Sequence, residues 1–422
     1  MSLLRWCTNK RGSGRALGRR VLLVSSVVTL LSVGLTATAN NAGASSAPYT
    51  IGLVTDQTGP AAPTYQNVIN GVQARIGLQN AHGGVNGHQI KLVTADDATS
   101  PPSNTTAAQE LISKGALVLI QDSAVAFVSA KVMQQAGMPV VGTGTDGYEW
   151  GQQPYTNMFS LSNELWDSKE PVYALSPAIW KGLKKVGSFG YSISPSSTAS
   201  AKSFGYAAKK AGLNPVYINT SLPFGTVNTT SMALSLRSNG VQGVYMPLDD
   251  NTNIAIITSA RQAGVKLNVT VSATGYGQNL LDNKSAVQAS QNVYFISPAG
   301  APVELNTPAT VAMQKALATY GRYHGVPNFG AYEGWLTADL TIKGLQLAGK
   351  TATKQSFIAN LRKVTNYTGG GLIPTPVNFT QFGKNPNTFC TYYTILKGSR
   401  FVVANNSQPI CSKLLPNSNQ AR

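Results

Sequence analysis

The sequence predicts an α/β fold in two units of similar size, and three observations support this prediction. Short apolar runs alternate with longer stretches whose apolar residues recur every three or four positions, a pattern typical of parallel strands joined by helices. The alternation pauses over residues 145–168 and then restarts. The chain has 422 residues, which is long enough for two hydrophobic cores.

The first unit alternates regularly from residue 50 onward. Its expected strands cover 50–56, 89–97, 116–121 and 138–144, and its expected helices cover 67–80, 102–115 and 124–137. In the first of these helices, Val68, Val72 and Ile76 form one apolar stripe. Gly115 and Gly137 end the other two, in the position where glycine commonly closes a helix.

The second unit repeats the same alternation. Its expected strands cover 184–192, 214–222, 241–249, 267–275 and 292–300, and its expected helices cover 199–212, 229–240 and 253–264. We expect Thr230 to cap the helix that begins at 229. Two further helices are expected over 330–350 and 353–364, and hairpin strands around Lys397–Ser399.

Residues 1–44 have the composition of an export signal. Six basic residues precede the first acidic residue of the chain: Arg5, Lys10, Arg11, Arg15, Arg19 and Arg20. The apolar run that follows, 21–35, is shorter than the ~20 residues of a membrane span, and Ala-x-Ala sites come next. We expect export to the cell exterior or a periplasm-like space, with cleavage after Ala39 or Ala44. An uncleaved anchor is the alternative.

The charge of the chain is strongly positive, with 33 basic and 16 acidic residues. Without the six basic residues of the signal, 27 basic and 16 acidic residues remain, a net charge of +11. This balance predicts attraction to anionic surfaces. Because the basic residues are scattered and no cluster alternates with aromatic residues, the sequence does not indicate nucleic-acid binding.

Motifs for catalysis, metals and nucleotides are missing from the sequence. Only three histidines occur, at 82, 88 and 324, so no metal-ligand set is expected. Gly142 and Gly144 form a lone Gly-x-Gly, a weak nucleotide signal. Asp96 and Asp97 form a carboxylate pair at a strand end, but no nucleophile or base motif accompanies it. We therefore expect a protein without cofactors that is not an enzyme.

Two cysteines remain beyond the signal, which contains Cys7. Cys390 and Cys411 flank the hairpin strands expected around Lys397–Ser399. In an exported protein this arrangement predicts one disulfide near the base of the hairpin, worth ~3 kcal/mol for a loop of this size. Two free thiols are the alternative.

Several segments resemble the type 1 periplasmic binding proteins of branched-chain amino acid ABC importers. They are IGLVTDQTGP, NGV at 70–72, HGGVNGHQIKLVTADDATSPP, AAQELISKGALVLIQDSA and AGMPVVGTGTD, in this order and spacing. The resemblance is strong over 49–165, fair over 180–300 and loose beyond 300.

The resemblance implies two Rossmann-like lobes joined by three hinge crossovers. Residues 49–161 plus 299–368 would form the first lobe, and 162–298 plus 369–422 the second. It also implies a cleft that closes over a small-molecule ligand, and the permease subunits of an ABC importer as partners. We expect a monomer.

Candidate ligand-binding residues of the first lobe lie at strand-to-helix turns, beyond the carboxyl ends of the strands. The resemblance implies that Ser123 binds a ligand carboxylate together with the amides that follow; the alternative is that it caps its own helix. Thr145 matches the family pattern after the next strand. Asp146 departs from it, and either binds a ligand cation or forms a local salt bridge. The remaining candidates of this lobe are Thr64, Tyr65 and Tyr148.

In the second lobe, Asp249 and Asp250 follow a strand, and we expect one of them to face the cleft and the other to be solvated. Thr274 stands where the amino-acid-binding members of the family have Glu for the ligand's ammonium group. This departure argues against carrying over leucine, isoleucine or valine as the ligand. Tyr276 is expected to act as a lid, and Trp166, at the crossover, either lines the cleft or packs in a core.

The sequence therefore predicts an extracytoplasmic solute-binding protein. It would deliver a small polar solute (an amino acid, an amide or a small organic acid) to an ABC importer by cleft closure. A ligand-sensing receptor module of the same fold is the alternative, and a hydrolase is disfavoured by the missing motifs.

Overall fold

The computed structural model describes residues 46–143, 147, 149–161, 177–225, 227–297, 300–384 and 388–413. The predicted export signal, 1–44, lies outside these residues. No helix within them has both the length and the apolar surface that a membrane span requires.

The first sheet is parallel throughout and, in the described residues, has five strands. They are β1 (Ser46–Thr55), β2 (His88–Asp96), β3 (Val118–Asp122), β4 (Val140–Gly142) and β5 (Met158–Ser160). Their spatial order is β2-β1-β3-β4-β5. The chain therefore moves outward from β1 to β2 and then returns past β1 to build the rest of the sheet.

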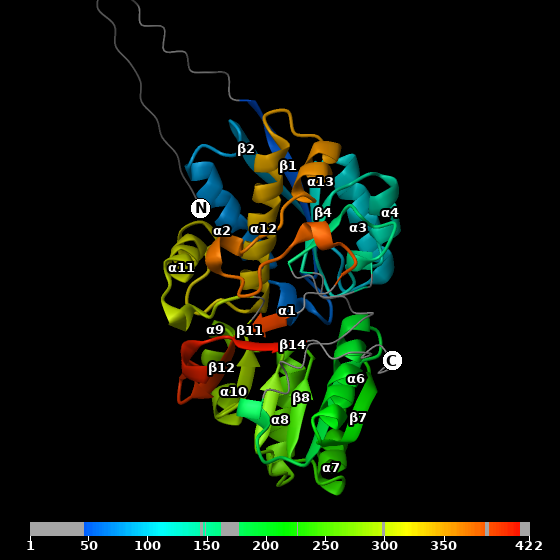
Figure 1. Ribbon diagram of the computed structural model, residues 1–422, viewed down its shortest axis with the longest axis vertical. Helices are drawn as coiled ribbons and strands as arrows, with labels where there is room; N and C mark the ends of the chain where they lie inside the picture. Colours follow the sequence, from blue (N-terminus) through cyan, green and yellow to red (C-terminus); the bar gives the residue numbers. More distant parts are fainter. Residues whose placement is uncertain are drawn as a thin grey trace, which may run out of the picture. The chain divides into compact units, whose positions relative to one another are not determined.

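Helices cover both faces of the first sheet (Figure 1). One face carries α2 (Val68–Ala81), preceded by α1 (Ala62–Tyr65), together with α11 (Pro308–Tyr320), α12 (Phe329–Ala348) and α13 (Lys354–Leu361). The other carries α3 (Pro101–Ser113) and α4 (Ala130–Gln135). Side chains alternate across the sheet, so Leu53 is buried on the α2–α12 side, and Val54 and Leu119 on the α3–α4 side. Short 3-10 turns flank these elements at η1 (Glu149–Gly151) and η3 (Val303–Leu305).

The close approach of α2 and α12 depends on glycine. A Cβ atom on Gly334 would lie 2.2 Å from the carbonyl oxygen of Val68, and one on Gly71 would lie 2.2 Å from that of Ala331. Because both neighbours are backbone atoms, a larger residue would force the helices apart. The two glycines therefore allow α12, which is distant in sequence, to pack beside α2 (Figure 1).

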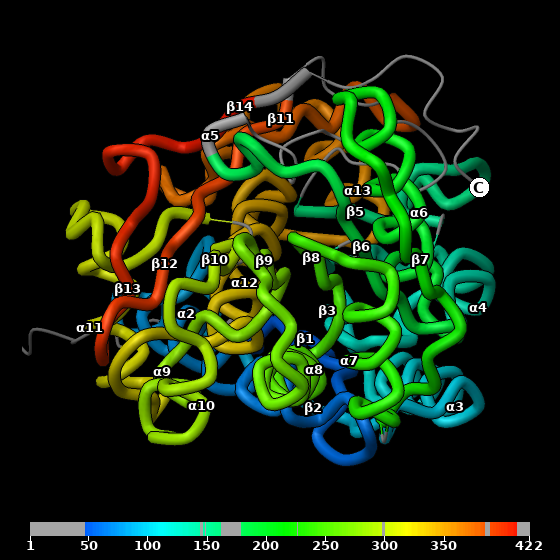
Figure 2. The backbone as a smooth tube through the Cα atoms, turned by 90° about the horizontal axis from the view of Figure 1, so that it is seen from below, coloured from blue at the N-terminus to red at the C-terminus, as the bar shows by residue number. Residues whose placement is uncertain are grey.

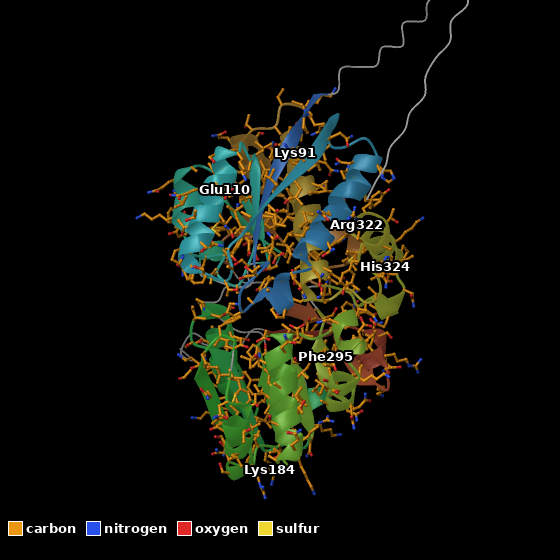
Figure 3. The ribbon with its side chains drawn as sticks, turned by 180° about the vertical axis from the view of Figure 1, so that it is seen from behind. Lys91, Glu110, Lys184, Phe295, Arg322 and His324 are labelled. Atoms are coloured by element: carbon orange, nitrogen blue, oxygen red, sulfur yellow. A yellow bond between two sulfur atoms is a disulfide. The ribbon has the colours of Figure 1, made fainter. Side chains whose placement is uncertain are left out.

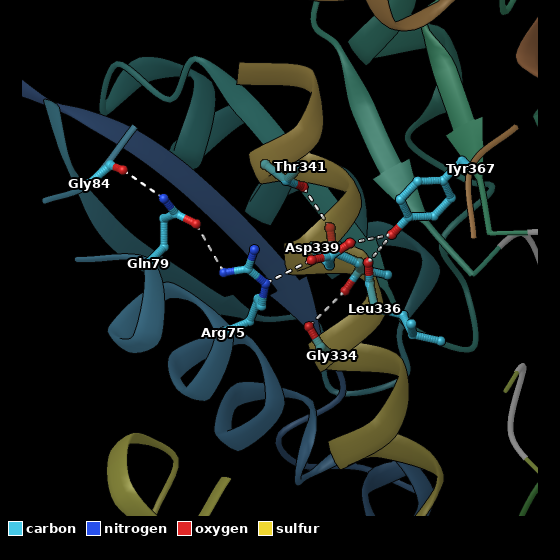
Figure 4. Close-up of polar contacts among 9 residues, drawn as sticks. Arg75, Gln79, Gly84, Gly334, Leu336, Asp339, Thr341 and Tyr367 are labelled. Atoms are coloured by element: carbon cyan, nitrogen blue, oxygen red, sulfur yellow. Dashed lines mark hydrogen bonds and ion pairs between the residues drawn. The ribbon is translucent and has the colours of Figure 1, made fainter. Parts of the chain in front are cut away.

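An ion pair also joins these two helices (Figure 4). The Nε atom of Arg75 on α2 lies 2.7 Å from Oδ1 of Asp339 on α12. The hydroxyl of Tyr367 donates to the other oxygen of Asp339 at 3.0 Å. Asp339 is thus a paired acid on the helix that carries Glu333, which is described below.

The second sheet repeats the order of the first and adds two antiparallel strands. Its strands are β6 (Lys185–Tyr191), β7 (Asn214–Leu222), β8 (Gly243–Met246), β9 (Val269–Ser272), β10 (Tyr294–Ile296), β12 (Tyr393–Lys397) and β13 (Arg400–Val403). The parallel part runs β7-β6-β8-β9-β10, after which β12 pairs antiparallel with β10 and β13 with β12. Figure 2 shows this late hairpin beside β10.

Helices also cover the second sheet. They are α5 (Pro177–Trp180), α6 (Pro195–Lys210), α7 (Thr229–Ser238), α8 (Asp250–Gln262), α9 (Gln278–Leu281) and α10 (Lys284–Ala289). Phe204 of α6 packs with Tyr245 on one face, and Ile256 of α8 joins Val244 in the core of the other. Phe295, labelled in Figure 3, is 1% exposed in this core. We call the two sheets with their helices the first and second lobes.

The last strands confirm the predicted disulfide. β11 (Thr388–Thr391) pairs antiparallel with β14 (Ile410–Lys413), and Cys390 is the register partner of Cys411. Their sulfur atoms are bonded at 2.02 Å. The crosslinked loop contains the β12–β13 hairpin, as the sequence predicts. Short 3-10 turns occur before and within this region, at η4 (Gly369–Gly371), η5 (Phe379–Gln381) and η6 (Asn405–Ser407).

Three local predictions differ from the structure. The helix expected over 124–137 is α4, which starts only at Ala130 after a series of turns. The N-cap of α7 is Asn228, whose side chain accepts from the Ser231 amide at 3.0 Å, and not Thr230, which lies inside the helix. Helix α11 is not among the expected helices, although Thr307 caps it and Pro308 begins it.

Candidate ligand-binding site

Strand order gives each lobe one point where a ligand site is expected. In a parallel sheet of order 2-1-3-4-5, successive connections leave on opposite faces between strands 1 and 3, and the crevice lies beyond their carboxyl ends. In the first lobe this switch point lies between the ends of β1 and β3. In the second it lies between the ends of β6 and β8. At each of the two switch points, aspartates lie at or shortly after a strand end.

On the α3–α4 side of the first switch point, the polar groups form a hydrogen-bonded network. The hydroxyl of Ser123 donates to Asp97 at 2.5 Å and accepts from the Val125 amide at 3.0 Å. Asn104 donates to Asp97 at 2.8 Å and to Gln121 at 3.1 Å. Ser123 therefore holds a turn and a buried carboxylate instead of starting a helix, so no helix N-terminus stands behind it.

Asp56, directly after β1, joins this network from the next strand. Its Oδ2 atom accepts from the Ala124 amide at 2.8 Å, which helps to hold the turns that precede α4. Burial, and secondly the charge of Asp97, raise the pKa of Asp56 to about 7. Burial therefore favours the protonated form of this carboxyl group.

On the α2–α12 side of the same switch point, buried oxygens have no hydrogen-bond partner among the described residues. They are Oγ1 of Thr55, both carboxylate oxygens of Asp122 and Oε2 of Glu333. Burial, followed by the charge of Asp56, raises the pKa of Asp122 to about 8. Burial, followed by the charge of Asp122, raises the pKa of Glu333 well above its ordinary value. Both shifts favour the protonated form of these acids.

Asp96, next to Asp97, has a different role. It accepts from the amides of Gln57, Thr58 and Ala98 and from the Thr58 hydroxyl, at 2.6 to 3.2 Å. Burial alone would raise the pKa of Asp96, but the hydrogen bonds, above all that of Thr58, lower it. Asp96 therefore holds the loop after β1, whereas Asp97 belongs to the buried hydrogen-bonded network.

At the second switch point, Asp249 caps α8. Its Oδ1 atom accepts from the Thr252 amide at 3.0 Å, and its Oδ2 atom accepts from the hydroxyl of Tyr191, the last residue of β6. Burial, then the charge of Asp249, raises the pKa of Tyr191 far above its ordinary value, so the phenol stays protonated and donates. This contact joins the ends of β6 and β8.

Asp250 connects the two lobes. Its Oδ1 atom accepts from the Thr64 hydroxyl of α1 at 2.8 Å, and its Oδ2 atom accepts from Asn279 at 2.9 Å. Asp250 is 4% exposed and Thr64 is 5% exposed. Burial raises the pKa of Asp250, and the bond from Thr64 counteracts it. Of the pair, Asp250 is buried and Asp249 is half-buried, and both carboxylates accept hydrogen bonds.

The other predicted residues of the described chain lie in packed positions. Tyr65 is buried and meets Phe329 edge to face, with ring centroids 5.6 Å apart. Thr274 donates to the Leu248 carbonyl at 2.7 Å and accepts from Asn253 at 3.2 Å, so its hydroxyl is used within its lobe.

Tyr276, which we expected to act as a lid, is buried. It is 1% exposed, its hydroxyl donates to Glu304 at 2.7 Å, and that hydroxyl accepts from the Val303 amide at 3.0 Å. The ring packs against Phe401. Tyr276 is therefore fixed in the core, between the second lobe and the segment that leads to α11.

Four predicted site residues lie outside the described part of the chain: Thr145, Asp146, Tyr148 and Trp166. Their ligand contacts stay predictions, as do those of Thr64, Tyr65, Ser123, Asp249, Thr274 and Tyr276.

The sequence analysis did not predict that acidic side chains are buried around both switch points. In the described chain, no lysine or arginine is buried, whereas five acids are: Asp56, Asp97, Asp122, Asp250 and Glu333. Lys91, Lys184 and Arg322 illustrate the exposed bases (Figure 3). For the aspartates, the signal was available in the repeated placement of Asp at the ends of apolar strands. For Glu333, no local signal distinguishes it from a surface glutamate of a helix.

Comparison with known proteins gives a consistent family match. A family model described as periplasmic binding protein matches residues 48–398. Leu/Ile/Val-binding protein homolog 7 of Brucella suis biovar 1 is 26% identical over 310 residues, which cover 70% of this chain and 76% of the relative. Homolog 3 of Brucella melitensis biotype 1 is 26% identical over 223 residues, 51% of this chain and 58% of the relative, so less than two thirds of that relative is spanned.

Solved structures share the fold. A fatty acid ABC transporter substrate-binding protein from Thermomonospora curvata superposes with a TM-score of 0.72 at 19% identity, covering 88% of this chain and 94% of that chain. Its likeness extends over two lobes, which agrees with the two sheets described above. Because the family match runs through both lobes and the segments that join them, the chain belongs to the periplasmic binding protein family.

Proposed function

We propose that this chain is an exported solute-binding protein that delivers a small polar solute to the permease subunits of an ABC importer. The solute would be an amino acid, an amide or a small organic acid. Members of the family are substrate-binding transport proteins and not enzymes, which is consistent with this role. The lobes would close over the solute, and the bound solute would stabilise the closed state.

The hydrogen bond between Thr64 and Asp250 is the observation that carries the proposal. Thr64 lies shortly after β1, and Asp250 shortly after β8, so the bond joins the segments that follow one strand of each switch point. Because this bond brings the two switch points close together, residues of both lobes could contact one solute. The bond would break when the lobes open.

The proposal includes the finer predictions made from the sequence. Residues 1–44 would be removed after Ala39 or Ala44, and the lobes would comprise 49–161 plus 299–368 and 162–298 plus 369–422. Solute contacts would come from Ser123, Thr145 and Asp146 in the first lobe and from Asp249 and Thr274 in the second. The mature protein would act as a monomer.

A thermal-shift screen of the exported protein tests the proposal. Amino acids, amides, short-chain acids and aromatic acids would each be added in excess. A solute at 100 times its dissociation constant stabilises the folded state by ~2.7 kcal/mol, which raises the melting temperature measurably. Small-angle scattering with the best solute should show a smaller radius of gyration. Chemical conversion of the bound solute would contradict the proposal.

A further inference from the structure

Thr55, Asp122 and Glu333 form a group of buried oxygens that nothing in the described chain satisfies. Thr55 and Asp122 are 0% exposed, and Glu333 is 2% exposed. Thr55 and Asp122 are register partners at the ends of β1 and β3, so their side chains lie on the same face of the sheet. Glu333 reaches this face from α12, which packs against β3. We call these three residues the Thr55–Asp122–Glu333 group.

The position of this group coincides with the switch point of the first sheet. Thr55 ends β1 and Asp122 ends β3, the two strands between which a ligand crevice opens in this topology. The hydroxyl of Thr55 gives an observation independent of the acids. It is a fully buried neutral group without a partner in the described residues, and it lies beside Asp122.

On the opposite face of the same strand ends most polar groups are hydrogen-bonded, although Oδ1 of Asp56 has no partner among the described residues. There, Gln121 donates to Ser129 at 2.9 Å, and Ser129 donates to Asn104 at 2.7 Å. Asn104 in turn donates to both Asp97 and Gln121. Buried polar groups are normally satisfied in this way, because an unsatisfied one costs ~1–3 kcal/mol. The unpaired oxygens on the α12 side are therefore candidates for hydrogen bonds with a ligand.

Among the described residues, the ionisable side chains around the group are carboxylic acids and the phenol of Tyr332. Asp56 follows β1 and Asp97 follows β2, while Tyr332 precedes Glu333 on α12. Among the described residues the salt bridges are Arg75–Asp339 and Lys114–Glu110, so none of these acids has a basic partner there. A ligand carboxylate would disfavour the ionisation of these acids further, whereas a ligand cation would favour their ionised forms and pair with them.

We propose that the Thr55–Asp122–Glu333 group is a subsite for a positively charged nitrogen group of the solute, a primary ammonium or a guanidinium. This inference rests on the proposed function and narrows its solute to one that carries such a group. Ionised carboxylates and the Thr55 hydroxyl oxygen accept hydrogen bonds, and both cations present several N–H donors. A metal ion fits less well, because no three His, Cys, Asp or Glu side chains of the described residues gather to hold one.

The proposal predicts that binding releases protons. The raised pKa values favour the protonated acids in the empty subsite, and a bound cation favours their ionised forms. The affinity for an amine should therefore rise with pH between about 6 and about 8. A solute that instead accepts hydrogen bonds from the protonated carboxyl groups would bind more weakly as the pH rises.

Isothermal titration calorimetry of the full mature chain provides the test. The probes are agmatine and putrescine as cations, leucine and γ-aminobutyrate as zwitterions, benzoate and butyrate as anions, and butyramide as a neutral solute. We expect binding among the probes with a positive nitrogen group, with an affinity that rises with pH. Binding confined to the anions or to butyramide would overturn the subsite but leave the proposed function standing. Binding of none of these probes would count against both.

Variants assign the effect to the group. Asn and Gln resemble the protonated acids in shape, so Asp122→Asn and Glu333→Gln should fold as the parent does. Each should weaken the best amine by about tenfold or more, and should remove most of its pH dependence. Asp339→Asn is the matched control, since it removes an acid of α12 that is paired with Arg75 and lies outside the site. Unchanged amine affinity in both test variants would overturn the proposal.

Discussion

At the scale of single residues, adjacent aspartates take different roles that the sequence does not reveal. Asp249 caps a helix and accepts from Tyr191, whereas Asp250 bonds to Thr64 of the other lobe. The sequence places both after a strand and so locates the site. It cannot show which one meets α1, because that contact joins residues 186 positions apart. Glu333 is a stronger case, since only the packing of α12 brings it to Asp122.

Replacing Thr64 by Val tests the bond between the lobes. The variant keeps the shape of the side chain but leaves Oδ1 of Asp250 without its donor, which should lower the free energy of unfolding by ~1–3 kcal/mol. It should also shift the solute-free protein toward more open lobes, seen as a larger radius of gyration in solution scattering. Thr341→Val is the control: that buried threonine bonds only within α12, to the Thr337 carbonyl. A radius of gyration that is equal in both variants would show that the bond does not hold the lobes.

At the scale of elements, the periodicity of the sequence predicts most strands and helices. The expected strand 214–222 coincides with β7, and the expected helix 330–350 is nearly α12. The helix expected at 124 fails because Asp56 and Ser123 hold the backbone of 124 and 125 in turns. Local apolar spacing carries no information on such contacts, since Asp56 comes from another strand. The pairing of α2 with α12 is equally invisible before the fold is known.

Gly334→Ala should disturb this helix pair. The added methyl group would lie 2.2 Å from the Val68 carbonyl oxygen, so α12 must shift, which should cost ~1–3 kcal/mol. Urea denaturation followed by circular dichroism would measure the loss. Gln346→Ala, an exposed change on the same helix, should alter stability by less than ~0.5 kcal/mol. Equal stability of the two variants would mean that the contact of α2 and α12 tolerates a methyl group.

At the scale of the whole molecule, the acidic and basic side chains are distributed differently between the interior and the surface. The buried charged residues of the described chain are all acids, in a protein whose formal net charge is +17. The pKa values of Asp56 and Asp122 are about 7 and about 8, against an ordinary value of 3.8. Those of Asp250 and Glu333 are raised as well. The folded protein thus holds protons that the unfolded chain would release.

Stability should therefore fall as the pH rises. Each carboxyl group with a raised pKa contributes to the free energy of unfolding. This contribution is complete below about pH 4 and decreases by up to ~1.4 kcal/mol per pH unit above that. The decrease ends at the folded-state pKa of the group. For Asp56 and Asp122 the loss ends near pH 7 and pH 8. Calorimetric melting temperatures should decline from about pH 5 to about pH 8, and Asp122→Asn should flatten this decline. A melting temperature that rises over the same interval would refute the protonated state of these acids.

The disulfide makes the completion of the second sheet depend on redox conditions. Cys390 and Cys411 close a ring that contains β12 and β13, the antiparallel strands added beyond β10. The disulfide links β11 and β14 at the two ends of this hairpin, whereas the parallel strands β6–β10 precede Cys390 in the sequence. In a reducing compartment, β11 and β14 would be joined only by their backbone hydrogen bonds. For the exported protein that we propose, an oxidising exterior would form this crosslink.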